Sequence, residues 1–336
     1  MKPKSVKQVI YINGIGNISP QATFDLAQNT AVVKSSTAFM ACQEPSYKQY
    51  IPRKQLRRMS RAVRMGLTVA HKALEEAQPS AIDAIITGTA WGCVKDTEKF
   101  LETIIENNEQ YLTPTAFVQS THNTVAGQIA LMHHCNCYNM TYVQGAVSFE
   151  SALLDAQLLF MDNQAQNIIV AGVDEQTEQL QLLLKRLSCA RIKRPMGEGA
   201  ACFVLSTQAK PNSYAKLLAT RMIYRPQNQQ VLEQQVLATL KSVALSPASV
   251  DLVFSGSPHS RFEKKLFPTA SIIDYKQLCG AYPTSTAFAT AMAAKAIIGD
   301  PYTCHILSIP TKIYNNVLIY NQDQDTYHSL ILLSSI

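Results

Sequence analysis

Hydrophobic and polar positions follow two different periods along the chain, and the two periods alternate. Short apolar runs such as "AIIT", "NIIVAGV" and "ACFVL" are typical of buried strands. Between them, apolar residues recur at helical spacing, most clearly in "RKQLRRMSRAVRMGLTVAHKALEEA" (53–77). Strands that alternate with helices predict an α/β protein. None of the apolar runs approaches the roughly 18–20 residues that a membrane-spanning helix needs.

The alternating pattern occurs twice, which predicts two similar halves of the βαβαβ type. We place the first half at residues 1–185 and the second at 186–336, with "GEGAACFVLS" opening the second half. Because no Pro-, Gly- or Ser-rich linker separates the halves, we expect one compact body. The pattern also predicts a strand at "HILSIPT" and a loop at "LTPTAFVQSTHN".

Composition and charge narrow the class of protein. The chain has 336 residues, of which 47% are hydrophobic and 16% charged, as in a globular protein. The formal charge of +6 is concentrated in residues 53–66 and 185–195. Without a nucleic-acid motif, this mild excess favours an acidic protein partner over nucleic acid. The eight scattered cysteines suit reduced thiols, and the N-terminus lacks a secretory signal pattern, so we expect a cytoplasmic location.

Three motifs resemble ligand-binding sequences, but a structural role explains each of them better. "NGIGNIS" lacks the third glycine of a dinucleotide fingerprint, so its glycines are expected to permit a tight turn. "GEGA" lacks the Lys-Ser/Thr of a phosphate loop. "HHCNC" does not space its cysteines and histidines as zinc ligands. We therefore expect neither a cofactor nor a metal.

Several segments, in this order, resemble the β-ketoacyl-acyl-carrier-protein synthases of the thiolase superfamily: "VIYINGIGNISP", "RKQLRRMSRAVRMGLTVAHKALEEA", "AIITGTAWGCVKDTEKFL", "LTPTAFVQSTHNTVAGQIAL", "IIVAGVDE", "GEGAACFVL" and "DYKQLCGAYPTSTAFATAMAAKAI". The resemblance covers almost the whole chain. It implies a thiolase fold, with two βαβαβ-type halves in a five-layer αβαβα sandwich built as a dimer. It also implies the condensation of an acyl chain with malonyl carried on acyl carrier protein.

The resemblance also indicates where the catalytic residues of such an enzyme would lie, and here the chain departs from the family. In "TYVQGAVSFESALLDA", Ala146 stands at the position of the nucleophilic cysteine, with Gln144 as an alternative two residues earlier. Gly256 and Ala281 stand at the two histidine positions, and His259 is an alternative for the first.

Other family positions are kept or changed. Lys276 is retained, and we expect a structural or electrostatic role for it. Asp323 falls near the gate of the acyl tunnel, where an acidic side chain disfavours an apolar acyl tail. Four basic residues correspond to the helix that docks acyl carrier protein, although a solvated helix face explains them equally well: Arg53, Lys54, Arg57 and Arg58.

Three functional hypotheses follow from this resemblance. The first is a non-catalytic, chain-length-factor-like subunit of fatty-acid or polyketide biosynthesis, of the aryl-polyene type, that pairs with an active ketosynthase. The second is an active condensing or malonyl-decarboxylating enzyme, an acyltransferase with remodelled groups such as Gln144 and His259. The third is a scaffold that binds acyl carrier protein. The chain would be a heterodimer in the first case, and self-association to a homodimer is the alternative.

Overall fold

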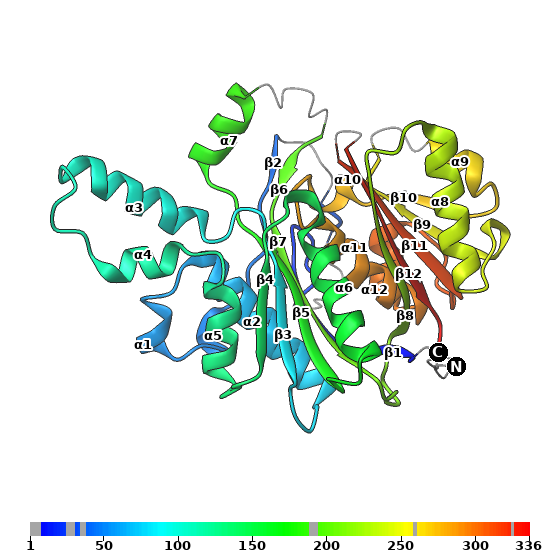
Figure 1. The fold of residues 1–336 in the computed structure, drawn as a ribbon, viewed down its shortest axis with the longest axis horizontal. Helices are drawn as coiled ribbons and strands as arrows, with labels where there is room; N and C mark the ends of the chain where they lie inside the picture. The colour runs from blue at the N-terminus through cyan, green and yellow to red at the C-terminus, as the bar shows by residue number, and fades with distance from the viewer. Residues whose placement is uncertain (1–7, 25–30, 34–37, 188–193, 258–260, 324–325) are drawn as a thin grey trace.

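The two halves of the chain share one strand arrangement. The computed structural model describes residues 8–24, 31–33, 38–187, 194–257, 261–323 and 326–336 (Figure 1). The strands of the first half are β1 (Ile10–Ile18), β3 (Ala84–Gly88), β4 (Tyr138–Tyr142), β5 (Asn167–Asp174) and β7 (Gly199–Ser206). Those of the second half are β8 (Ala215–Tyr224), β9 (Leu252–Ser255), β10 (Ser271–Asp274), β11 (Asn316–Asp323) and β12 (Tyr327–Ser334).

Strand order confirms the predicted duplication. The first half is ordered β4-β3-β5-β7-β1 and the second β10-β9-β11-β12-β8, so both run third, second, fourth, fifth, first. In each half, the third, second and fourth strands are parallel, and the fifth is antiparallel to both of its neighbours. A short antiparallel pairing of β1 with β8, from Ile10 to Ile12, joins the halves into one ten-stranded sheet.

The expected start of the second half needs revision. The strand in "GEGAACFVLS" is β7, which pairs with β1 and β5 and therefore belongs to the first half. An apolar strand that closes one half cannot be told by pattern alone from one that opens the next. The boundary after residue 185 stays a prediction, and strand pairing favours a later division, after Ser206.

Three apolar clusters define five alternating layers of helix and sheet. On the outer face of the first half lie α2 (Arg61–Ala77) and α5 (Thr124–Met132). Between the two half-sheets lie α6 (Ser148–Met161) and α11 (Ser285–Ile297), together with α12 (Pro301–Leu307). The outer face of the second half is covered by α8 (Gln229–Ser242) and α9 (Arg261–Leu266). This arrangement confirms the thiolase-type sandwich.

The glycines of "NGIG" allow close packing within β1, and the prediction that they form a tight turn after the strand is wrong. Gly14 and Gly16 lie inside β1, where a Cβ atom on either would overlap a backbone carbonyl oxygen of α2, Ala73 or Val69. The strand and the helix can approach this closely only because both positions lack a side chain. These glycines therefore belong to the packing of the first half.

Three local predictions differ from the structure. The single helix expected over 53–77 is two helices, α1 (Arg53–Leu56) and α2, because the Ser60 side chain caps α2 by accepting a hydrogen bond from Val63 N. The expected loop at 112–123 contains α4 (Pro114–Ser120). The expected strand at 305–311 overlaps α12, which begins where Asp300 accepts from Thr303 N and Pro301 takes the first helical position.

An arm made of α3 (Val94–Glu106) and α4 projects from the first half (Figure 1). Several of its apolar side chains are exposed: Leu101, Ile105, Tyr111, Phe117 and Val118. Two further short helices are α7 (Glu178–Arg186) and α10 (Lys276–Cys279), and β2 (Phe39–Met40) pairs with β6 (Met196–Gly197). In the described ranges, we find no helix whose length and hydropathy would let it cross a membrane.

Candidate functional site

The strand-to-helix elbow is intact but carries no nucleophile. After β4, a 3-10 turn (Gly145–Val147) leads into α6, and Gly145 adopts a φ of 57°, which favours glycine. Ala146 is half-buried on this turn and offers only a methyl group. Gln144 is exposed, and its Oε1 accepts a hydrogen bond of 2.5 Å from Ser151 Oγ. Ala146 therefore lies beside the N-terminus of α6, and its methyl group cannot act as a nucleophile.

Gly256, at the position expected for the first histidine, has no room for a side chain. It follows β9, and a Cβ atom here would overlap Asn321 Oδ1 and lie 2.7 Å from Tyr275 Oη. Asn321 is held in this place, because its Oδ1 accepts hydrogen bonds from Lys276 Nζ at 2.7 Å and from Tyr275 Oη at 3.1 Å. A histidine at position 256 would have to displace this hydrogen-bonded group.

Lys276 and Asp323 lie on either side of the same amide. Lys276 is half-buried, and burial lowers the pKa of its ammonium to about 8, with the neighbouring Arg194 guanidinium acting in the same direction. Asp323 lies two residues beyond Asn321 on β11, which places both side chains on one face of the strand. Burial raises the pKa of Asp323, and the Lys276 charge opposes that rise. The structure thus brings together three predicted positions, Gly256, Lys276 and Asp323.

Arg194 is a residue beside Gly256 that the sequence analysis did not single out. It counted toward the basic excess of residues 185–195, yet its side chain is only 10% exposed. One of its terminal nitrogens donates to Asp274 Oδ2 at 2.7 Å and to the carbonyl of Ser257 at 2.5 Å. Arg194 therefore tethers the segment that follows β9, next to Gly256.

Glu150 is a second residue that the sequence analysis missed. It lies on α6, one turn after Ala146, and is fully buried. Its Oε1 accepts a hydrogen bond of 2.6 Å from Ser329 Oγ, and burial raises the pKa of the carboxyl to about 7. The charge of Lys276 acts on this pKa in the opposite direction, which shows that the elbow helix and Lys276 face one another. An acidic residue within the apolar stretch "SFESALL" was the available signal.

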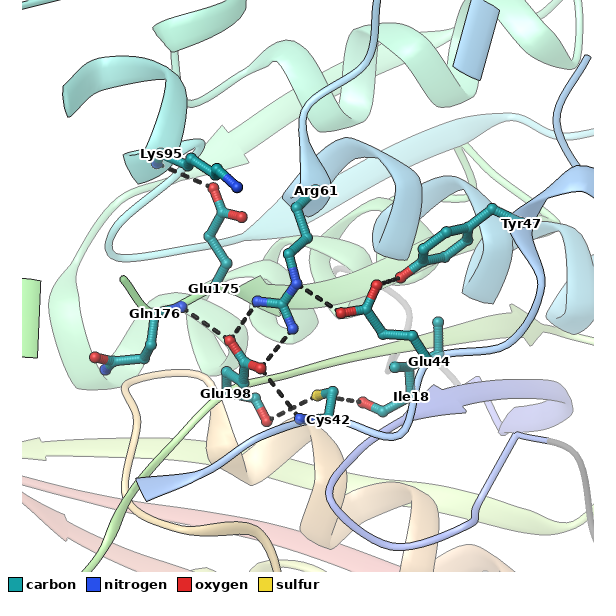
Figure 2. A network of polar contacts seen from close by, with 9 residues as sticks. All are labelled: Ile18, Cys42, Glu44, Tyr47, Arg61, Lys95, Glu175, Gln176 and Glu198. Atoms are coloured by element: carbon teal, nitrogen blue, oxygen red, sulfur yellow. Dashed lines mark hydrogen bonds and ion pairs between the residues drawn. The ribbon is translucent and has the colours of Figure 1, made fainter. Parts of the chain in front are cut away.

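Ala281, at the second histidine position, is held by its backbone. Its N donates to the carbonyl of Pro195 at 2.8 Å, and its carbonyl accepts from Gly197 N at 3.1 Å. Glu198, which directly follows Gly197, is buried and forms two hydrogen bonds of 2.5 Å with Arg61 at the start of α2. Figure 2 shows this carboxylate at the centre of a polar network.

The network joins several segments of the first half that are distant in sequence (Figure 2). Arg61 also donates to Glu44 at 2.6 Å, and Cys42 donates from its backbone N to Glu198 Oε1 at 3.1 Å. The carboxylate of Glu175 accepts from Lys95 N at 3.2 Å, and burial raises the pKa of Glu175 to about 7. Charges that satisfy one another in this way are typical of a structural anchor. The segment "GEGA" therefore contributes structural contacts beside Ala281, in keeping with the structural role expected for it.

The predicted docking residues lie together at the surface. Arg53, Lys54, Arg57 and Arg58 are all exposed, on α1 and the turn that follows it. The side chain of Gln119, on α4, donates to the carbonyl of Arg58 and connects this segment to the arm. The remaining candidate, His259, lies outside the described residues. In the described part of the chain, no three Cys, His, Asp or Glu side chains gather as metal ligands.

Comparison with known proteins defines the family. The model for the β-ketoacyl synthase N-terminal domain matches residues 32–244, which is more than half of the chain. The chain therefore belongs to the β-ketoacyl synthase family. No curated protein gives a significant sequence match.

Solved structures share the fold over the whole chain. The ishigamide ketosynthase/chain length factor superposes with a TM-score of 0.78 at 16% identity, covering 98% of this chain and 99% of that one. AntDE:AntF, a type II polyketide synthase acyl-carrier protein in complex with its ketosynthase, gives 0.78 at 14% identity, with 98% and 100% covered. The ketosynthase ApeO in complex with its chain length factor ApeC, from Xenorhabdus doucetiae, gives 0.74 at 14% identity, with 100% of both chains covered.

Proposed function

We propose that this chain is a non-catalytic, chain-length-factor-like subunit that completes a dimer with an active ketosynthase. The observation that carries the proposal is the packing around Gly256. The Asn321 amide and the Tyr275 hydroxyl occupy the space that a side chain at position 256 would need. With alanine at the nucleophile position and at the second histidine position, no group of the expected catalytic set remains at these three places. We therefore propose that the fold serves to form the dimer.

An exposed strand edge supports the proposed dimer. β4 is at the outer edge of the sheet, and no strand of the described residues pairs with its outer side. Its side chains Tyr138 and Met140, and Val143 just beyond, are 40%, 39% and 47% exposed. An unpaired edge with apolar side chains is suited to strand pairing with another chain. The similarity to ApeO–ApeC and to the ishigamide pair supports a ketosynthase as that partner.

We further propose that the basic residues on α1 and its turn receive acyl carrier protein. Four exposed cations, which form no ion pair within the described part of the chain, make a patch that attracts an acidic surface. The likeness to AntDE:AntF supports a carrier protein as the ligand. A complex that binds the carrier protein without influencing product length would instead indicate the scaffold function.

In the proposed complex, Asp323 and Lys276 limit the acyl tunnel. Their charges lie beside Asn321. An apolar chain end at this place would remove water from the two charged groups without offering them new hydrogen bonds or ion pairs. The tunnel would therefore end at this polar group, and product length would depend on it. A cytoplasmic location suits this role and remains part of the proposal.

Co-expression with candidate β-ketoacyl synthases tests the proposed assembly. We expect an affinity tag on this chain to recover the ketosynthase in a one-to-one complex, measured by light scattering after size exclusion. Recovery of only a homodimer of this chain, with the ketosynthase in a separate peak, would contradict the proposal. The second hypothesis, a remodelled enzyme, would require turnover of malonyl-carrier protein by this chain alone.

A further inference from the structure

A cavity of about 290 Å³ lies between β1, α2 and α11, away from the elbow. Ile15 and Asn17 of β1, Lys72 and Glu76 of α2, and Lys295 of α11 line it. Lys295 lies ten residues after the first residue of α11, or about 15 Å along the helix axis. The lining of the cavity shares no residue with the group around Gly256.

The cavity forms where the two half-sheets part. β1 pairs with β8 from Ile10 to Ile12, and beyond Ile12 no strand of the described residues lies beside this edge of β1. Ile15 N donates to Glu76 Oε2 at 3.0 Å in place of a strand partner, and Tyr214 Oη donates to the same oxygen at 3.0 Å. Glu76 is thus held by neutral donors at the side of the cavity.

Lys295 lacks the partner that a half-buried ammonium requires. No hydrogen bond or ion pair joins it to any described residue, although burial lowers its pKa. Lys72, which lines the same cavity, repels it, while the charges of Glu76 and Asp300 partly compensate. Lys72 forms an ion pair only with the exposed Glu75, at 3.2 Å. Two lysines and one glutamate thus line the cavity, so the charged side chains of its lining carry one net positive charge.

A further unsatisfied group lies at the same cavity. Asn17 is 3% exposed, and its Oδ1 has no hydrogen-bond partner among the described residues. A buried amide oxygen costs free energy when it is unpaired, so native proteins usually satisfy such an atom with a protein, water or ligand donor. A bound molecule with an anionic group and a hydrogen-bond donor would satisfy both Lys295 and Asn17.

We propose that this cavity binds a small anionic metabolite, with its carboxylate or phosphate group paired to Lys295 and assisted by Lys72. The volume suits a compact molecule, at the lower end of ligand sites, and excludes a long acyl chain. The site would give the subunit a ligand unrelated to the acyl tunnel. The inference does not depend on the proposed function.

Calorimetric titration of the purified protein with sodium malonate, and separately with sodium phosphate, tests the site at constant ionic strength. We expect saturable binding of at least one anion, weakened at least tenfold by Lys295→Met. The matched control is Lys265→Met, which removes an exposed lysine of α9. Absence of saturable binding for both anions, or equal affinity in Lys295→Met, would overturn the proposal.

Thermal unfolding separates this site from a structural role of Lys295. Lys295→Met removes an unpaired ammonium, so without anion the variant should unfold at the same temperature as the unaltered protein or higher. It should also lose the rise in unfolding temperature that malonate or phosphate produces. A lower unfolding temperature together with an unchanged response to anions would show that Lys295 serves a structural pair with Glu76, against the proposal.

Discussion

Lys276 Nζ donates a 2.7 Å hydrogen bond to Asn321 Oδ1, and this bond places the amide against Gly256. The retained lysine and the lost histidine position are thereby connected. As long as Lys276 and Tyr275 hold Asn321, position 256 cannot carry a side chain without displacing a hydrogen-bonded group. Reverting one catalytic position by itself would therefore not rebuild the family's active site.

Gly256→Ala should destabilise the protein. The new methyl group meets Asn321 Oδ1 and Tyr275 Oη, and overpacking of this kind costs about 1–3 kcal/mol. Urea unfolding followed by circular dichroism measures the change in the free energy of unfolding. In an Asn321→Ser background, the same substitution should cost less, because the obstructing amide is gone.

Gly127→Ala is the matched control for this prediction. Gly127 lies in α5, and a Cβ atom there would meet nothing within 4 Å. Alanine favours a helix over glycine, so this variant should gain up to about 1 kcal/mol. Equal losses at positions 127 and 256, or no loss at 256, would contradict the packing described around Asn321.

Glu150→Gln should change the pH dependence of stability. Burial raises the pKa of Glu150 from its usual 4.5 to about 7, so the folded state holds its proton over that interval more tightly than the unfolded state. The resulting stabilisation is complete below pH 4.5 and is lost as pH rises through 7, by about 3 kcal/mol. The glutamine variant lacks this contribution.

Unfolding free energies of both proteins between pH 4.5 and pH 8 measure the effect, and their difference isolates Glu150 from Glu175, which titrates in the same range. We expect the unaltered protein to lose stability relative to the variant as pH rises. A constant difference across this range would show that Glu150 ionises as an exposed carboxyl does.

Sequence patterns predicted the duplicated fold well, because the period of apolar residues reports burial directly. They failed where a capping side chain or a short apolar run determined where a helix begins or whether one forms, as at Ser60 and in the helix that follows Asp300. The predicted positions Gly256, Lys276 and Asp323 do gather around one side chain. That side chain, Asn321, could not be predicted, because its importance arises from residues distant in sequence that converge on it. The docking and tunnel assignments remain predictions.

Charge reversal in the basic patch should weaken binding of acyl carrier protein. Arg57→Glu with Arg58→Glu replaces two exposed cations, and we expect at least a tenfold loss of affinity and a weaker dependence on salt. Lys264→Glu with Lys265→Glu changes the net charge equally on the exposed side of α9 and serves as the control. If both pairs weaken binding alike, the attraction is general and the patch is a solvated surface.

Met140→Lys should impair pairing with the ketosynthase. Met140 lies in the middle of the exposed edge strand β4, where a lysine disfavours strand addition by another chain. Co-purification with the ketosynthase should fall, while the unfolding temperature of the isolated chain stays close to its original value. Ile298→Lys, which alters an equally exposed apolar residue after α11, should leave co-purification unchanged.

The central claim is that this chain assists condensation without performing it. The most direct measurement supplies acyl- and malonyl-carrier protein to this chain, to the ketosynthase and to their complex, and follows products and acyl-protein adducts by mass spectrometry. We predict elongated product from the complex, with acyl groups on the ketosynthase and none on this chain. Condensation or malonyl decarboxylation by this chain alone, or an acyl group covalently attached to it, would contradict the account.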